Sequence, residues 1–179
     1  QEQFWNLNAF FQQARLDERG GAAVLVDEPV GGPTFYASRS GVLQATYPEF
    51  AGRPVDPVEG TIRRRELSKL MTQSDDAQLA RAFVNRMWAH FFGYGFTNPV
   101  DDMGPHNPPS HPELLERLTQ QFRDSGYDVQ QLVRWITGSR AYQLSSRFGE
   151  RNAADDPAAG RVPLFSRVPA KPFTPEQVF

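Results

Sequence analysis

The stretch DDAQLARAFVNRMWAHFFG, residues 75–93, decides how this chain folds. Its apolar side chains recur every three or four residues and form one broad arc on a helical wheel, as in an amphipathic α-helix. Asp75 and Gln78 have the spacing of a capping box, which starts a helix, and Gly93 is typical of the residue that ends one. The stretch therefore predicts a helix over residues 76–92 with one buried face.

The same signals predict two further helices downstream. Ser110 opens one, over residues 111–124, and Asp128 opens the other, over residues 129–139. Each has an acidic or amide residue three positions later that would complete a capping box. Three capped helices joined by short links are expected to pack at an angle around one core, with Trp88 inside it.

The N-terminal third has a mixed pattern. Residues 3–16, QFWNLNAFFQQARL, have helical spacing, and Gly20 and Gly21 would end that helix. Short β-branched and aromatic runs between Gly and Pro follow, and then a short helix over residues 62–72. The expected fold class is mainly α: a compact multi-helix domain with a small irregular or β-hairpin segment near residues 22–47.

Four parts are expected along the chain. They are residues 1–20, a helix that ends a preceding domain or forms an N-terminal arm; residues 21–60, irregular with short strands; residues 61–148, a helical core domain; and residues 149–179, a loop and the start of a truncated C-terminal helix. The chain begins without Met and ends on FTPEQVF, which resembles a first helical turn. We therefore expect a fragment of a longer protein.

The amino-acid composition argues against nucleic acid as a partner and against a membrane span. The net charge is -2, without the clustered basic excess of a nucleic-acid-binding protein. The one basic run, Arg63-Arg64-Arg65, is followed by Glu66 and is expected on a solvated helix face. No apolar run approaches the roughly 18 residues that a membrane span needs. There is no cysteine, which excludes disulfides and thiol chemistry within this chain.

Four unusual motifs follow one another between Leu79 and Ser146. They are an Asn-Arg-x-Trp helix at 85–88, a Pro-Val-Asp-Asp turn at 99–102, an Asn-Pro-Pro-Ser-x-Pro-Glu-Leu-Leu cap at 107–115 and a closing Ser-x-x-Tyr-x-x-Ser-Ser at 139–146. In this order they resemble the planctomycete C-terminal domain of unknown function 1553. Residues 3–12 resemble, more weakly, the end of its companion, domain of unknown function 1549. The middle stretch departs from the family, whose members usually carry a longer segment there.

The resemblance implies a context and no reaction. Its members look like large periplasmic or secreted proteins, often with a cytochrome-c-type module at the N-terminus. It therefore implies an extracytoplasmic location, other domains of the same polypeptide as partners, and haem in a neighbouring domain, with no cofactor in this chain.

Polar residues near the predicted helix 76–92 are the candidate site. Arg86 and His90 lie four apart at one edge of its apolar arc, and Asn85 lies on the other side. Asp101 and Asp102 follow in the next turn. We expect Arg86 to hold one of these carboxylates in a partly buried ion pair that pins the turn. The alternative is an arginine that binds an anionic ligand.

A metal site is a second possibility for the same segment. Asp101, Asp102, His90 and His106 offer oxygen and imidazole ligands, although their spacing matches no tight metal motif. Two adjacent carboxylates diverge and make a poor acid–base pair.

Two functions follow from these observations. The leading hypothesis is a non-catalytic interaction or scaffold module of a larger extracytoplasmic multidomain protein, acting beside a haem domain or a polysaccharide. The alternative is a metal-dependent hydrolase that uses the Asp101, Asp102, His90 and His106 cluster. The sequence does not decide whether the protein is an enzyme.

Overall fold

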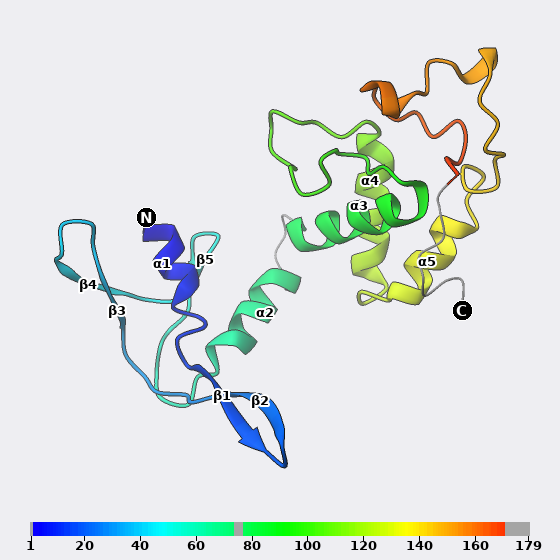
Figure 1. The fold of residues 1–179 in the computed structure, drawn as a ribbon. Helices are drawn as coiled ribbons and strands as arrows, with labels where there is room; N and C mark the ends of the chain where they lie inside the picture. Colours follow the sequence, from blue (N-terminus) through cyan, green and yellow to red (C-terminus); the bar gives the residue numbers. More distant parts are fainter. Residues whose placement is uncertain (1, 74–76, 171–179) are drawn as a thin grey trace. The chain divides into compact units, whose positions relative to one another are not determined.

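The chain divides into two compact units, Gln1–Asp75 and Asp76–Phe179, which we call unit 1 and unit 2. The computed structural model describes residues 2–73 and 77–170 (Figure 1). In this part of the chain, no helix combines the length and the apolar character that a membrane crossing requires.

Unit 1 is built on hairpins between two helices. In chain order its elements are α1 (Glu2–Asn8), β1 (Ala14–Arg19), β2 (Ala22–Asp27), β3 (Thr34–Ala37), β4 (Leu43–Thr46), β5 (Glu49–Phe50), β6 (Arg53–Pro54) and α2 (Arg63–Gln73). The strands pair as three separate antiparallel ribbons. Helices make up 37% and strands 14% of the structure, so the expectation of a mainly α chain is wrong. The strands also extend beyond the expected hairpin segment, 22–47, on both sides.

The first ribbon replaces the second half of a predicted helix. The helix expected over residues 3–16 ends at Asn8, and Ala14–Arg19 forms β1. Gly20 and Gly21 have φ angles of 61° and 81° and join strands whose last pair is Arg19 with Ala22. Two positive φ angles are what a two-residue hairpin turn of this hand requires, and glycine adopts them without strain. The two glycines therefore form a turn and do not end a helix.

The β3–β4 ribbon has two chemically different faces. Because side chains alternate along a strand, Thr34, Tyr36, Gln44 and Thr46 share one face, which we call the inner face. The opposite face, which we call the outer face, consists of Phe35, Ala37, Leu43 and Ala45, all exposed. The inner face lies against α1: the Trp5 and Tyr36 rings stack with centroids 4.6 Å apart, and Thr46 Oγ1 donates to Asn6 Oδ1 at 2.6 Å.

Arg63 ties unit 1 together from its interior. The residue is 3% exposed, and its guanidinium donates to Ala9 O at 3.1 Å, Thr34 Oγ1 at 3.0 Å and Gly32 O at 2.5 Å. Burial lowers the pKa of this guanidinium, because the charged form is desolvated. The solvated face expected for the arginine run is therefore wrong for Arg63.

The next arginine is also engaged in a structural contact. Arg64 Nε and Nη2 each donate to the Asp27 carboxylate at 2.8 Å, which links α2 to the end of β2. The hydrogen bond from Arg64 holds the pKa of Asp27 below its ordinary value. Arg65 alone of the three is exposed, as expected.

Unit 2 is the helical part of the chain. It consists of α3 (Gln78–Phe92), α4 (Pro112–Asp124), α5 (Val129–Thr137) and two short 3₁₀ turns, η1 (Glu150–Asn152) and η2 (Pro157–Ala159). The three predicted helices are confirmed to within two residues at each end. Helix α2, which was expected in the same domain over residues 61–148, lies in unit 1 instead.

One aromatic cluster forms the core of unit 2. Trp88 is 2% exposed, as predicted, and its ring lies 4.3 Å from Phe92 and 4.5 Å from Phe96. From α4 and α5 the core receives the buried side chains Leu115, Leu118, Phe122, Leu132 and Ile136.

The helix ends show which capping predictions are correct. Gly93, with φ 86°, ends α3, and Asp128 Oδ1 accepts from Gln131 N at the start of α5, both as predicted. Ser110 was expected to cap α4, but His111 occupies that position without a side-chain cap bond. The predicted Asp75 cap of α3 lies outside the described residues.

The segment after α5 returns to the core. The buried Asp155 carboxylate accepts from Leu164 N at 2.9 Å and from both Ser166 N and Ser166 Oγ at 2.7 Å. These bonds place Phe165 edge-on to Trp88, with centroids 5.3 Å apart. Burial would raise the pKa of Asp155, but the bonds from Leu164 and Ser166 outweigh it and the pKa is lowered. The predicted truncated C-terminal helix falls mostly on residues 171–179, outside the described residues.

Candidate functional site

The predicted Arg86–Asp101 pair forms, but at the surface. Arg86 Nη2 contacts Asp101 Oδ1, and the two side chains are 64% and 72% exposed. An ion pair in this setting is screened by water and contributes little to stability. The expectation of a partly buried pair that pins the turn is therefore wrong in its burial.

The other predicted ligands form a separate pair. Asp102 Oδ1 lies 2.8 Å from His106 Nε2, and these side chains are 45% and 69% exposed. His90 is exposed on α3, with its ring edge-on to Phe91. Over residues 2–73 and 77–170, no three His, Asp or Glu side chains gather in a geometry that could hold a metal ion.

Asn85, the remaining candidate, is the residue that holds the turn. Its side chain is fully buried, and Nδ2 donates to Thr97 O at 3.2 Å and to Val100 O at 3.0 Å. Its Oδ1 accepts from Thr97 N at 3.1 Å. Gly95 leaves the space that this amide occupies, since a Cβ there would lie 2.6 Å from Asn85 Oδ1.

Two more asparagines complete the loop. Asn98 exchanges two hydrogen bonds with the backbone of Gly95, and Asn107 Nδ2 donates to Asn98 O and Asp102 O. The peptide bond between Asn98 and Pro99 is cis. The buried and half-buried amides of this segment therefore serve the backbone, whereas Arg86, Asp101 and His106 are exposed to solvent.

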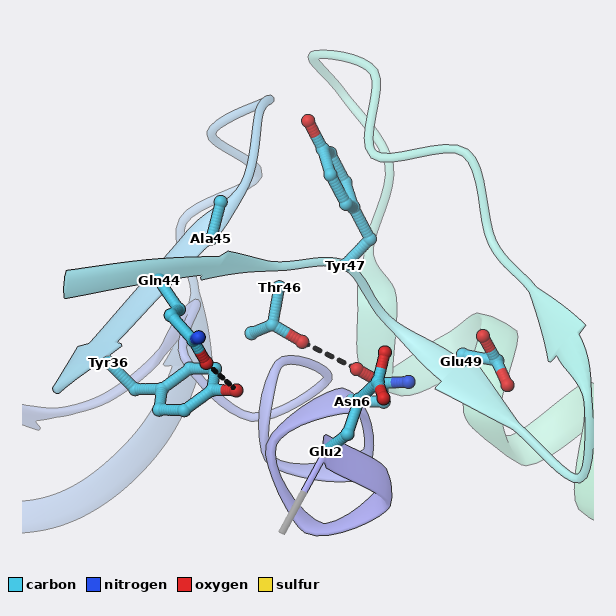
Figure 2. Close-up of a pocket in the computed structure, with 8 residues that line it drawn as sticks. All are labelled: Glu2, Asn6, Tyr36, Gln44, Ala45, Thr46, Tyr47 and Glu49. Carbon is cyan, nitrogen blue, oxygen red and sulfur yellow. Dashed lines mark hydrogen bonds between the residues drawn. The ribbon is translucent and has the colours of Figure 1, made fainter. Parts of the chain in front are cut away.

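Unit 1 contains a cavity that the sequence did not predict (Figure 2). It has a volume of about 640 Å³, within the range of small-molecule sites. It is lined by α1, by the inner face of the β3–β4 ribbon, by the outer-face residue Ala45 and by two residues after β4. The lining residues are Glu2, Asn6, Tyr36, Gln44, Ala45, Thr46, Tyr47 and Glu49. In Figure 2 the side chains of Ala45 and Tyr47 project from the side of the strand opposite to Gln44 and Thr46.

Two hydrogen bonds orient the amides of this cavity. Tyr36 Oη donates to Gln44 Oε1 at 2.7 Å, and Thr46 Oγ1 donates to Asn6 Oδ1 at 2.6 Å, as the dashed lines in Figure 2 show. Each amide therefore uses its oxygen within the protein and keeps its NH₂ group as a donor. Glu49 and Glu2 add carboxylate acceptors.

The sequence did not predict this cavity, because no strand bounds were assigned inside the segment that forms it. Residues 22–47 were expected as an irregular or β-hairpin segment, and the helix over residues 3–16 was expected to extend through the start of β1. A usable signal was present in LQAT, residues 43–46, which alternates apolar and polar side chains as a half-buried strand does. That alternation places Gln44 and Thr46 together on one face.

Comparison with known families supports the resemblance noted in the sequence. A family model described as PSD1, a protein of unknown function (DUF1553), matches residues 63–179, more than half of the chain. No curated protein and no solved structure matches the chain.

Proposed function

Since the chain belongs to the DUF1553 family of proteins of unknown function, we propose from its geometry that it is a non-catalytic interaction module of a larger extracytoplasmic multidomain protein. The observation that carries the proposal is the outer face of the β3–β4 ribbon. Phe35 is 60% and Leu43 67% exposed on that face, and Ala37 and Ala45 complete it without a polar side chain. Contiguous exposed apolar surface of this kind is typical of an interaction site.

Unit 1 has a small apolar core, which supports the proposal that a partner covers it permanently. Only five apolar side chains are buried within residues 2–73: Ala9, Phe10, Tyr36, Pro48 and Leu67. A two-stranded ribbon is only marginally stable unless a further layer covers it. A partner that stays bound to the apolar outer face would therefore increase the stability of this ribbon.

We assign this position to another domain of the same polypeptide. A covalently linked domain is held at a high effective concentration, so that even a small interface stays occupied. The haem implied by the resemblance would belong to that neighbouring domain. No residue of this chain is assigned to holding it.

Hydrogen exchange tests the proposal. The amides of β3 and β4 should exchange more slowly in the full polypeptide than in residues 1–179 alone. Leu43→Asp should remove that extra protection, because it places a charge in an apolar interface. Val162→Asp is the matched control, because Val162 is 61% exposed in unit 2. Equal exchange in the two proteins would refute the interface.

Elemental analysis separates the module from the hydrolase alternative. The purified protein is expected to contain no stoichiometric metal. Zinc, iron or calcium at one equivalent, lost on substitution of Asp102 or His106, would overturn the non-catalytic function.

A further inference from the structure

We propose that the cavity between α1 and the inner face of β3–β4 binds a neutral polyhydroxylated ligand, namely a sugar residue. The proposal goes beyond the interaction module and does not depend on it. The module uses Phe35 and Leu43 on the outer face of the ribbon, neither of which lines the cavity. The amides of the cavity belong to α1 and to the inner face.

The chemistry of the lining selects the class of ligand. Asn6 Nδ2 and Gln44 Nε2 are donors that no described residue uses, because the amide oxygens already accept from Thr46 and Tyr36. The Glu2 and Glu49 carboxylates are acceptors in the lining. Neither takes part in the ion pairs found within residues 2–73 and 77–170. A sugar hydroxyl both donates and accepts a hydrogen bond, so it can use both kinds of group at once.

Anions and metal ions fit the same lining less well. An anion would be repelled by the two carboxylates, Glu2 and Glu49, without a cation to offset them among the lining residues. A metal ion would find only two carboxylates there, and the described residues contain no group of three His, Asp or Glu side chains that could hold one. A neutral ligand meets donors and acceptors without either conflict.

The polar groups are held in place before a ligand arrives. The Tyr36 ring is stacked on Trp5 and only 9% exposed, which fixes the hydroxyl that orients Gln44. Thr46, 4% exposed, fixes Asn6 in the same way. Groups that are already oriented lose less conformational freedom on binding, which favours affinity.

NMR titration tests the site with matched probes. Glucose, galactose and mannose serve as neutral sugars, and glucuronate carries one negative charge. At least one neutral sugar should shift the side-chain NH₂ signals of Asn6 and Gln44 in a saturable way. Glucuronate should bind at least about tenfold more weakly than glucose, because of the two carboxylates. No saturable shift with any neutral sugar would overturn the proposal, as would equal binding of glucuronate.

Variants on one strand separate the cavity from the interface. Gln44→Met removes a donor from the inner face and should weaken sugar binding about tenfold. Gln130→Met, on the exposed side of α5, is the control and should leave binding unchanged. Leu43→Asp should abolish docking of the neighbouring domain and leave the sugar titration intact. Sugar binding that survives both Gln44→Met and Glu49→Gln would refute the site, even if Leu43→Asp confirms the interface.

Discussion

Asn85 and Thr97 hold each other through two hydrogen bonds: Thr97 N donates to Asn85 Oδ1 at 3.1 Å, and Asn85 Nδ2 donates to Thr97 O at 3.2 Å. Both residues are buried, at 0% and 2% exposure. The Asn85 side chain, which belongs to α3, thus makes the two hydrogen bonds to the Thr97 backbone that a neighbouring β-strand would otherwise make. This relationship gives the Asn-Arg-x-Trp motif a structural role at its first position.

Asn85→Leu should destabilise unit 2 by about 3 kcal/mol, because it leaves Thr97 N and the carbonyls of Thr97 and Val100 buried without partners. Urea denaturation followed by near-UV circular dichroism measures the loss. Gln130→Leu, at an exposed position of α5, is the control and should change stability little. An Asn85→Leu protein as stable as this control would contradict the role of the amide.

Gly95→Ala should cost about 1 to 3 kcal/mol, because the new Cβ would lie 2.6 Å from Asn85 Oδ1 and 2.8 Å from Thr97 O. Gly149→Ala is a matched change, since no atom lies within 4 Å of its added Cβ and its φ of -171° is extended. Thermal melts of the two variants should therefore differ clearly. Equal midpoints would mean that the loop adjusts at no cost.

Arg86→Met should change the free energy of unfolding by less than about 1 kcal/mol, because the pair with Asp101 is exposed on both sides. The partly buried pair expected from the sequence would instead make the loss large, because removing one partner leaves a buried charge unpaired. Melting curves at low and high salt measure the effect, and salt should reduce it further. A loss as large as that of Asn85→Leu would show that the ion pair holds the turn after all.

Arg63→Met should destabilise unit 1 by about 3 kcal/mol, because three acceptors in its interior lose their donor. Arg63→Lys should recover only part of the loss, since one ammonium lacks the planar fork that reaches Ala9, Gly32 and Thr34 together. Hydrogen exchange of peptides from residues 2–73 reports on this unit directly. Arg65→Met, at an exposed neighbouring position, is the control, and the amides of this variant should exchange at the same rates as those of the parent protein.

The stability of unit 2 should fall in acid partly through Asp155. Its folded pKa is lowered from the ordinary value of 3.8, so its contribution is present above that value and is lost as the pH falls through the folded pKa. Asp155→Asn should lower stability at neutral pH and flatten the decline below pH 4. Denaturation at a series of pH values measures both slopes. Parallel slopes would exclude Asp155 as a source of the acid sensitivity.

The helices of unit 2 were predictable because their signals are local. The apolar periodicity of residues 78–92, the stop at Gly93 and the cap at Asp128 each act within one or two helical turns. Ser110 is an example in which the local signal fails. Its backbone N–H donates to Phe96 O, and this contact with a residue distant in sequence outweighs the capping pattern that predicted Ser110 as the N-cap of α4.

The rest of the structure depends on contacts that no local pattern encodes. Residues 14–19, ARLDER, favour a helix by composition, yet they form a strand because they pair with residues 22–27. Arg63 is buried because backbone carbonyls from distant segments converge on it. Asn85 and Arg86 are neighbouring polar residues in the sequence, but burial makes Asn85 structural, whereas Arg86 is exposed.

The place of Phe165 bears on how the protein is made. Trp88, Phe92 and Phe96 leave the ribosome well before the segment that covers them, since Phe165 contacts all three from beyond α5. Contacts between residues far apart in sequence close late and slowly. The nascent chain therefore carries an open aromatic surface during synthesis, when it is most prone to aggregate. A translational pause before Phe165 emerges from the ribosome prolongs this state.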